Sequence, residues 1–264
     1  MTNEFQQHGY WAIILGGSSG LGLASAKKLA RHGMNICIIH RNSRSEMKAV
    51  SQYFEDIKAL GVRFLALNMD AVNPQKMQEA LVKIKAETGN KKIRCLLHSI
   101  AKGNLKPMED EEEATLRKDD FMITFENMTV SLYQWTKMLL QHDLFAEDSR
   151  VLSFTSEGNQ KAIKHYAAVS IAKAGLEALT RNMALELAPF GIRANCIQAG
   201  VTYTPSQNRI PGSEKMRKNS QKRNPHQRLT TPEDVGNVVY LLCKDEASWI
   251  SGAIIPIDGG ESIA

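Results

Sequence analysis

The sequence of 264 residues lacks several features that define whole classes of protein. No apolar run approaches the ~20 residues that a membrane span requires. Residues 1–9 are polar and include the acidic Glu4, so they do not have the pattern of a secretory signal. No tract rich in proline, glycine or serine, and no internal repeat, divides the chain. We therefore expect one domain over residues 1–264, in the cytoplasm and away from membranes.

Cysteine is scarce, and the four cysteines are widely spaced in apolar segments. They are Cys37, Cys95, Cys196 and Cys243. This pattern predicts buried thiols in a reducing compartment rather than disulfides or metal ligands. The net charge of +5 is modest, and no aromatic-basic module accompanies it. The composition therefore favours neither a metal site nor a nucleic-acid partner.

Short apolar runs alternate with helical segments along the whole chain. Strands are predicted at residues 11–15, 34–39, 63–67, 93–98, 151–155, 192–197 and 253–257. Helices are predicted at residues 21–31, 45–60, 74–87, 171–187 and 232–243, with a further long helix ending near residue 142. Nearly continuous apolar strands between helices indicate a parallel sheet that is covered on both faces. The fold class is therefore α/β: a single-domain, Rossmann-type, doubly wound parallel sheet of about seven strands with helices on both faces.

A glycine-rich turn follows the first strand and opens the first helix, which is the context that dinucleotide binding requires. Gly16 permits a tight exit from the strand, Gly20 lets the backbone approach a pyrophosphate, and Gly22 lets the helix pack closely on the sheet. The free N–H groups at the helix N-terminus add a site for phosphate. The predicted cofactor contacts in this turn are Gly16, Ser18, Ser19, Gly20, Leu21 and Gly22.

The end of the second strand indicates which cofactor is used. A carboxylate there would accept the ribose 2′-hydroxyl of NADH, whereas arginine would accommodate the 2′-phosphate of NADPH. The chain has His40-Arg41-Asn42-Ser43-Arg44 at this place and no carboxylate. Guanidinium pairs with phosphate in a fork geometry. We therefore expect NADPH rather than NADH, with contacts from Arg41 and Asn42; the alternative is that Arg41 and Arg44 only solvate a loop.

Tyr166 and Lys173 are separated by six residues. In a helix this spacing is about two turns, so both side chains would share one face. A nearby cation favours the ionised phenol and would lower the pKa of the tyrosine, as a proton-transferring group requires. The alternative is an ordinary helix with a solvent-facing lysine.

Several motifs, taken in order, resemble those of the short-chain dehydrogenase/reductase family over essentially the whole chain. They are Gly16-x3-Gly20-x-Gly22, Asp70, Asn127, Ser156, Lys173, the run from Ala199 to Thr204, and Asp258-Gly259-Gly260. The resemblance implies Asp70 as a contact of the adenine. The further cofactor contacts that it implies are Ala71, Ser99, Ile100, Ala101, Lys173, Ala199, Gly200, Thr202 and Thr204.

Three departures from the typical family pattern point to one branch. Typical members place the tyrosine four residues before the lysine, where this chain has Val169. The Tyr-x6-Lys spacing, the His98-Ser99-Ile100 run and Ala199-Gly200 are instead similar to the bacterial enoyl-acyl-carrier-protein reductases. Many of those reductases have an aromatic residue where this chain has Ser156, which makes the chain more similar to their NADPH-linked subgroup.

The resemblance implies an NADPH-dependent reductase of α,β-unsaturated acyl thioesters in fatty-acid elongation. Tyr166 would hydrogen-bond the enolate oxygen, Lys173 would hold the nicotinamide ribose, and Ser156 would supply a second hydrogen bond or none. Asn127 would support the lysine or would merely pack inside its helix. His98 would line the cofactor pocket rather than act as a general base.

Residues 204–227 are long and polar, which is typical of a mobile lid over a substrate. The basic side chains at 209–223 could dock acyl carrier protein or the phosphates of coenzyme A, or could simply be solvated. An acyl channel could be lined by Met108, Met122, Met128, Met138, Ile210 and Met216. The family also implies a homo-oligomer, a tetramer.

Two rival functions remain open. One is a carbonyl reductase of the same family, such as a 3-oxoacyl reductase, that uses Ser156 and Tyr166 as a rearranged pair. Val169 weighs against it, because no tyrosine occupies the typical position. The other is an NADP(H)-binding sensor without turnover.

Overall fold

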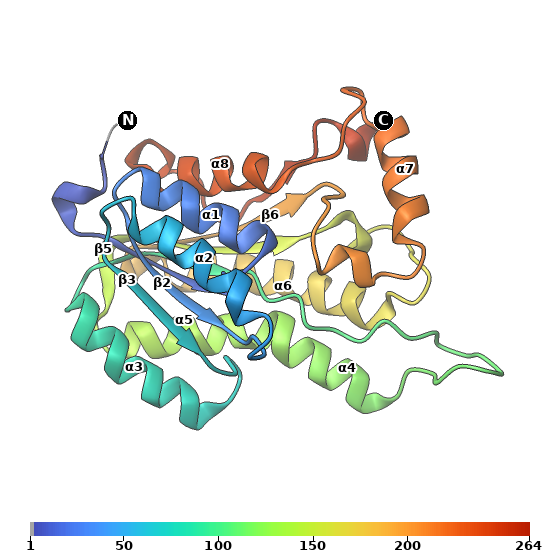
Figure 1. Cartoon of the computed structure of the whole chain (residues 1–264), viewed down its shortest axis with the longest axis horizontal. Helices are drawn as coiled ribbons and strands as arrows, with labels where there is room; N and C mark the ends of the chain where they lie inside the picture. Colours follow the sequence, from blue (N-terminus) through green and yellow to red (C-terminus); the bar gives the residue numbers. More distant parts are fainter. Residues whose placement is uncertain (1–2) are drawn as a thin grey trace.

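A computed structural model describes residues 3–264 of the chain, and its centre is one sheet of seven parallel strands (Figure 1). The strands are β1 (Trp11–Leu15), β2 (Asn35–His40), β3 (Phe64–Asn68), β4 (Ile93–His98), β5 (Phe145–Thr155), β6 (Ile192–Ala199) and β7 (Ile254–Ile257). Their order is β3-β2-β1-β4-β5-β6-β7, and every neighbouring pair is parallel. The order reverses between β1 and β4, where such sheets form a crevice at the carboxyl ends of their strands. The predicted fold class is confirmed.

Helices cover both faces of the sheet, as expected (Figure 1). One face carries α1 (Gly20–Arg31), α2 (Met47–Lys58) and α8 (Pro232–Cys243), whose apolar side chains share a core cluster. The other carries α3 (Pro74–Thr88), α5 (Ser131–Gln141) and α6 (Ala167–Glu186), with a second cluster. Burial of both strand faces explains why the strands are apolar throughout rather than alternating.

Helix starts follow local sequence rules. Thr231 caps α8: its hydroxyl accepts from the Asp234 N–H at 3.2 Å, and the Asp234 carboxylate accepts from the Thr231 N–H at 2.9 Å. Pro232 occupies the first helical position, where its missing N–H costs nothing.

Two segments differ from the sequence expectation. The single long helix expected before residue 142 is divided into α4 (Lys118–Phe125), a π-helical turn (Glu126–Val130) and α5. Such turns occur often at functional sites, and this one contains Asn127. The segment 204–227, expected as an irregular lid, contains the helix α7 (Ser213–Arg223), which stands at the edge of the molecule near the C-terminus (Figure 1).

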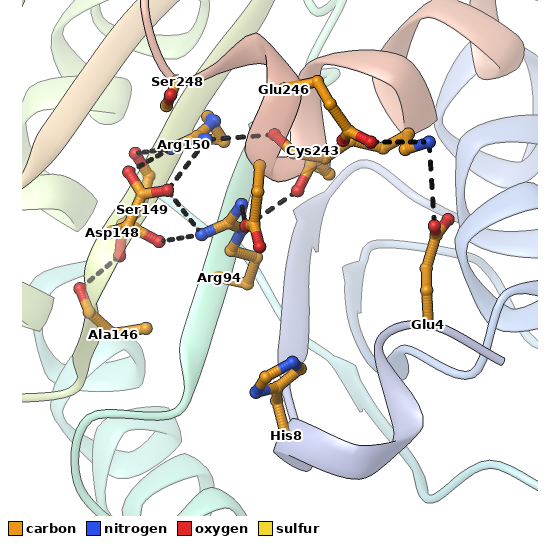
Figure 2. Close-up of polar contacts among 12 residues, drawn as sticks. Glu4, His8, Arg94, Ala146, Asp148, Ser149, Arg150, Cys243, Glu246 and Ser248 are labelled. Carbon is orange, nitrogen blue, oxygen red and sulfur yellow. Dashed lines mark hydrogen bonds and ion pairs between the residues drawn. The ribbon is translucent and has the colours of Figure 1, made fainter.

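A cluster of three arginines lies on β4, β5 and β6, and Figure 2 shows two of them, Arg94 and Arg150. Arg94 and Arg150 pair with the Asp148 carboxylate at 2.7 and 2.6 Å, and Arg193 also pairs with it. Both Arg94 and Arg150 have only 1% of the side chain exposed. Asp148 is therefore the shared counter-ion of this arginine cluster.

The same guanidinium groups bind the last turn of α8 (Figure 2). Arg94 Nε donates to the Cys243 carbonyl at 3.0 Å, and Arg150 Nε donates to the Leu242 carbonyl at 2.7 Å. These carbonyls have no partner within the helix and carry its partial negative charge. The arginine cluster therefore fixes the end of α8 against the sheet.

Within residues 3–264, we find no helix with the length and apolar character that a membrane crossing demands. The same residues contain no group of three or more histidine, cysteine, aspartate or glutamate side chains placed to hold a metal ion. All four cysteines are buried free thiols, as predicted.

Candidate active site

The glycine turn lies against the backbone that follows β4. Gly16 has φ of +85°, and a Cβ at this position would lie 2.5 Å from the Ser99 carbonyl oxygen. A Cβ on Gly22 would lie 2.5 Å from the Gly16 carbonyl oxygen. Only glycine fits at either place, so the predicted tight turn and close helix packing are both present.

Several of the predicted cofactor residues surround a small cavity of about 100 Å³ at the start of α1. Ser19 has extended backbone and precedes α1, so the first N–H groups of this helix point out of its N-terminus. The cavity is lined by Gly16, Ser19, Gly20, Leu21, Ser99, Ile100, Ala101, Lys173 and Thr204, together with Phe154, Pro205 and Ser206. A cradle of glycines and helix N–H groups fits the pyrophosphate of a dinucleotide. Ser18 and Gly22 lie outside the lining.

The predicted adenine-end residues lie at the carboxyl ends of β2 and β3. Arg41 Nη1 pairs with the Asp70 carboxylate at 2.8 Å, and the Asn42 N–H donates to the Asn68 side-chain oxygen at 3.1 Å. Burial opposes ionisation of Asp70, but the Val72 N–H and the cations around it lower the pKa of this carboxyl overall. One of those cations is Lys102, which the sequence did not single out.

Ala71 has a structural part in this region. Its carbonyl accepts a hydrogen bond from the indole N–H of Trp135 at 2.8 Å, which joins the loop after β3 to α5. The small cavity at the start of α1 is not lined by Arg41, Asn42, Asp70 or Ala71. Their contacts with a cofactor remain predictions.

The three predicted catalytic residues converge on one wall of the crevice. Ser156 follows β5, Tyr166 immediately precedes α6, and Lys173 lies two turns into that helix. The Ser156 and Tyr166 hydroxyl oxygens are 3.5 Å apart. Lys173 Nζ donates to the Phe154 carbonyl at 2.6 Å, and Tyr166 and Lys173 are both buried. The expectation that tyrosine and lysine share one side of the helix agrees with this arrangement.

The pKa of Tyr166 differs from expectation. Burial raises it, and the hydrogen bond with Ser156 only partly opposes that shift. Our expectation that a cation lowers the pKa of Tyr166 is therefore wrong for this state of the protein. Burial also lowers the pKa of Lys173, to about 8, against the opposing effect of Cys196 and Glu177. In the isolated protein Tyr166 is thus a neutral hydrogen-bond donor.

A cavity of about 590 Å³ extends from this group and is lined in part by residues of the segment 204–227. Its lining includes the predicted site residues Ser156, Tyr166, Lys173, Ala199, Gly200, Thr202 and Thr204. Its apolar wall contains Leu105, Met128, Ile163, Val169, Ile210 and Met216. This volume is typical of a site for a small organic molecule. Apolar side chains beside one cluster of hydroxyls suit a ligand with a polar head and a hydrocarbon tail.

Half of the residues predicted to line an acyl channel border the large cavity. Met128, Ile210 and Met216 line the large cavity. Met138 is packed in the core cluster beneath the sheet, and Met108 and Met122 are exposed. Of the methionines predicted to line the channel, Met128 and Met216 do border the cavity, whereas Met138 lies in the core and Met108 and Met122 lie on the surface.

His98 does not line either cavity, so that expectation was wrong. Only 1% of its surface is exposed, and burial together with the positive charge of Lys173 lowers its pKa to about 3. Its Nε2 lies 2.8 Å from the Ser131 hydroxyl, which itself donates to the Asn127 carbonyl. Since that hydroxyl has a single proton, His98 must donate through Nε2.

Asn127 lies in the π-helical turn, and its side-chain amide donates to the Ile123 carbonyl at 2.8 Å. This bond is within its own stretch of helix, which is the packing alternative. The carbonyl of Asn127 and the hydroxyl of Ser131 connect the turn to His98. Support of Lys173 by Asn127 stays a prediction.

The sequence did not reveal two acidic residues beside the site. Glu177 in α6 is buried and accepts hydrogen bonds from the Thr155 hydroxyl at 2.8 Å and from the Asn159 amide. Glu261, near the C-terminus, pairs with Arg223 of α7 at 2.7 Å. In the sequence, the only local signal for Glu177 is its spacing of four residues, about one helical turn, after Lys173.

The segment 204–227 is linked to the loop that carries Ser156 through one arginine. Arg223 also pairs with Glu157 at 2.6 Å, and Glu157 directly follows Ser156. In the same segment Lys218 pairs with Glu214, and Arg217 donates to Gln207 at 2.7 Å. Several cations of the predicted docking surface thus have partners within the chain.

Comparison with known proteins agrees with this geometry. A family model described as enoyl-(acyl carrier protein) reductase matches residues 16–262. The 7alpha-hydroxysteroid dehydrogenase of Paraclostridium sordellii is 26% identical, over 96% of this chain and 91% of that protein. The enoyl-(acyl-carrier-protein) reductase (NADH) of Bacillus cereus is 28% identical, over 90% of each chain. The crystal structure of the enoyl-(acyl-carrier-protein) reductase (NADH) from Aquifex aeolicus superposes with a TM-score of 0.85 at 25% identity and covers 97% of both chains.

Proposed function

The chain belongs to the enoyl-(acyl carrier protein) reductase family of short-chain dehydrogenases/reductases, and we propose that it reduces the C=C bond of α,β-unsaturated acyl thioesters. The observation that carries this proposal is the position of Tyr166, the only tyrosine that lines the large cavity. Tyr166 precedes α6, while the position four residues before Lys173 is the buried, aliphatic Val169. The acidic hydroxyl has thus moved by three residues relative to typical carbonyl reductases.

Displacement of the hydroxyl suits enoyl reduction for a chemical reason. When a carbonyl is reduced, the proton is needed on the oxygen attached to the carbon that receives hydride. When an enoyl thioester is reduced, hydride adds to the β-carbon and negative charge develops on the thioester oxygen, several bonds away. A neutral donor near that oxygen stabilises the enolate by about 3–4 kcal/mol. Tyr166 is such a donor, because burial raises its pKa and keeps it protonated.

The chain offers a residue for each further task. The nicotinamide cofactor, when bound, supplies the hydride. Lys173 borders both cavities and would hold the ribose hydroxyls while its charge favours the developing enolate. Ser156, 3.5 Å from the Tyr166 hydroxyl, would orient that hydroxyl. The apolar wall around Met128 and Ile210 would exclude water from the reacting carbon.

We propose NADPH as the cofactor, although the two enoyl-(acyl-carrier-protein) reductases named above are described with NADH. The proposal is supported by Arg41 and Lys102, which lie about the Asp70 carboxylate at the adenine end. The nearby carboxylate of Glu46 accepts from the Ser43 N–H at 2.7 Å and from the Ser43 hydroxyl, so it is engaged away from the ribose. A 2′-phosphate would find guanidinium and ammonium groups here.

We propose that the acyl thioester enters under a mobile lid segment, in a homotetramer located in the cytoplasm. Acyl carrier protein would dock on the basic residues at 209–223, of which Lys215 and Arg223 already border the cavity. Fatty-acid elongation would supply the substrate.

A carbonyl reductase is the second candidate, because one observation favours it. Ser156 and Tyr166 are within hydrogen-bond reach, which is the pairing that carbonyl reduction would use. The two functions differ in their substrates and can be separated directly.

The test is NADPH consumption by the purified protein with crotonyl and acetoacetyl thioesters. We expect turnover of the crotonyl thioester, and a fall of about 10²–10³ in kcat for Tyr166→Phe. The exposed Tyr133→Phe is the matched control and should leave kcat unchanged. Turnover of the acetoacetyl thioester alone would replace the proposal with carbonyl reduction. NADPH binding that stabilises the protein without any turnover would indicate a sensor.

A further inference from the structure

One buried carboxylate joins the two segments that carry the catalytic groups. Glu177 lies in α6, one turn after Lys173, and is 7% exposed. Its Oε1 atom accepts from the Thr155 hydroxyl at 2.8 Å and also from the Asn159 side-chain amide. A buried carboxylate with two donors is strongly held, because leaving it unpaired would cost several kcal/mol.

The two donors flank the loop that carries Ser156. Thr155 ends β5 and Asn159 ends the short turn after it, so Glu177 ties both ends of this loop to α6. Between them lies Gly158, where a Cβ would be 2.7 Å from the Tyr166 ring. The loop therefore contacts Tyr166 through the Ser156 hydroxyl and through the backbone of Gly158. Because these contacts join the loop to Tyr166, the position of the loop influences the position of the Tyr166 ring and hydroxyl.

Glu177 also supplies the negative charge that faces Lys173. The titratable groups around the lysine are His98 from β4, Cys196 from β6, Tyr166 at the start of α6, and Glu177 itself. Burial lowers the pKa of His98 to about 3 and raises that of Cys196 to about 11, so neither is charged near neutral pH. Burial raises the pKa of Tyr166 as well. Arg181 lies beyond Cys196 and adds only positive charge.

We propose that Glu177 is a positioning residue of the active site. It holds the Ser156 loop in contact with Tyr166 and keeps Lys173 protonated. It does not touch the substrate. The inference rests on the proposed function for its catalytic consequence, but the effect of Glu177 on the protonation of Lys173 is measurable without turnover.

Two variants separate the two effects. Because both hydrogen bonds reach the same oxygen, Glu177→Gln keeps an acceptor for Thr155 and Asn159 while it removes the charge. Glu177→Ala removes both. The exposed Glu186→Gln in the same helix is the matched control for loss of one negative charge. Thermal unfolding of each variant shows whether it is folded before it is assayed.

The first readout is the protonation of Lys173 in the protein without cofactor. Trace acetylation with acetic anhydride across a pH series, quantified on the peptide that contains Lys173, gives its pKa, which is about 8 in the parent protein. We expect Glu177→Gln to lower the midpoint by about one unit, because an opposing charge has been removed, and Glu186→Gln to leave it unchanged. Equal midpoints in all three proteins would overturn the electrostatic half of the proposal.

The second readout is the pH profile of kcat and kcat/KM, measured at saturating NADPH with the concentration of the crotonyl thioester varied. The alkaline fall of kcat/KM should move to lower pH in Glu177→Gln, while Glu177→Ala should also lose about 10-fold or more in kcat at its optimum. Equal kcat in the Gln and Ala variants would overturn the loop-holding half. If the parent protein reduces no thioester, the proposed function fails, and the acetylation midpoints still decide whether Glu177 controls Lys173.

Discussion

Substitution of Asp148 by asparagine should destabilise the fold far more than the same substitution of Asp245, the other acidic partner of the arginine cluster. Asp148 pairs with Arg94, Arg150 and Arg193, and two of these guanidinium groups are 1% exposed. Removal of one partner from a buried ion pair costs about 3–5 kcal/mol, because the remaining charge stays buried. Without the Asp148 charge, Arg150 would keep no carboxylate partner and Arg94 would keep only the exposed Asp245. The carbonyls of Leu242 and Cys243 would still accept hydrogen bonds but carry no full charge.

Asp245→Asn is the matched control, since Asp245 pairs with Arg94 at 2.6 Å but has 83% of its side chain exposed. Such a pair contributes about 0–1 kcal/mol. At about 2–4 °C per kcal/mol, Asp148→Asn should lower Tm by about 6–20 °C and Asp245→Asn by no more than about 4 °C. Both are measured by urea and thermal unfolding at one protein concentration, because assembly would otherwise alter the apparent stability.

The pH dependence gives a second check on Asp148. Burial opposes its ionisation, but hydrogen bonds from Arg150 and the charges of all three arginines lower its pKa overall. A carboxyl whose folded pKa is lowered adds stability above its unfolded pKa of about 3.9, and this stability is lost as pH falls through the folded value. The difference between parent and Asp148→Asn should therefore be largest near neutral pH and shrink in acid. Equal stability of the two proteins at neutral pH would refute the assignment of Asp148 as the shared counter-ion.

Two further outcomes follow from the site. Burial lowers the pKa of Lys173 to about 8, so kcat/KM should fall as pH rises through that value. A pH profile of kcat/KM that stays flat to pH ~10 would show that the positive charge of Lys173 is not needed. Arg41→Ala should raise the KM for NADPH by about 10-fold or more and change the KM for NADH little, because only the 2′-phosphate needs the guanidinium. Steady-state kinetics with both cofactors measures the two KM values. An equal rise in both would contradict the proposed preference for NADPH.

The sequence predicted features whose chemistry is local. The roles of Gly16 and Gly22 depend on a turn between adjacent elements, and the structure confirms the close approaches that exclude a side chain there. The Tyr166 and Lys173 spacing likewise needed only helix geometry. The alternation of apolar runs was enough for the parallel sheet, because strands buried on both faces are apolar throughout.

Features made by residues far apart in sequence were not predictable. Glu177 acquires its role only when Thr155 and Asn159 come to face α6, which no sequence spacing specifies. His98 was misplaced because alternate residues of a strand face opposite sides, and its neighbour Ser99 is the one that borders the cofactor cavity. The pKa of Tyr166 was misjudged because burial outweighs any effect of a neighbouring charge.

The helix α7 was missed for a different reason. Ser213–Arg223 is polar almost all round, so it lacks the apolar stripe that marks most helices. It is held instead by side-chain contacts at its end, where Arg223 bridges Glu157 and Glu261.

The most direct test of the central claim is the destination of the hydride. The protein would be given equal amounts of crotonyl and acetoacetyl thioesters together with NADPH that is deuterated at its transferable position, and both products would be analysed by mass spectrometry. We expect deuterium in the butyryl thioester, and the loss of this label with Tyr166→Phe. Deuterium in the 3-hydroxybutyryl thioester, with the crotonyl thioester left intact, would contradict enoyl reduction by the displaced tyrosine.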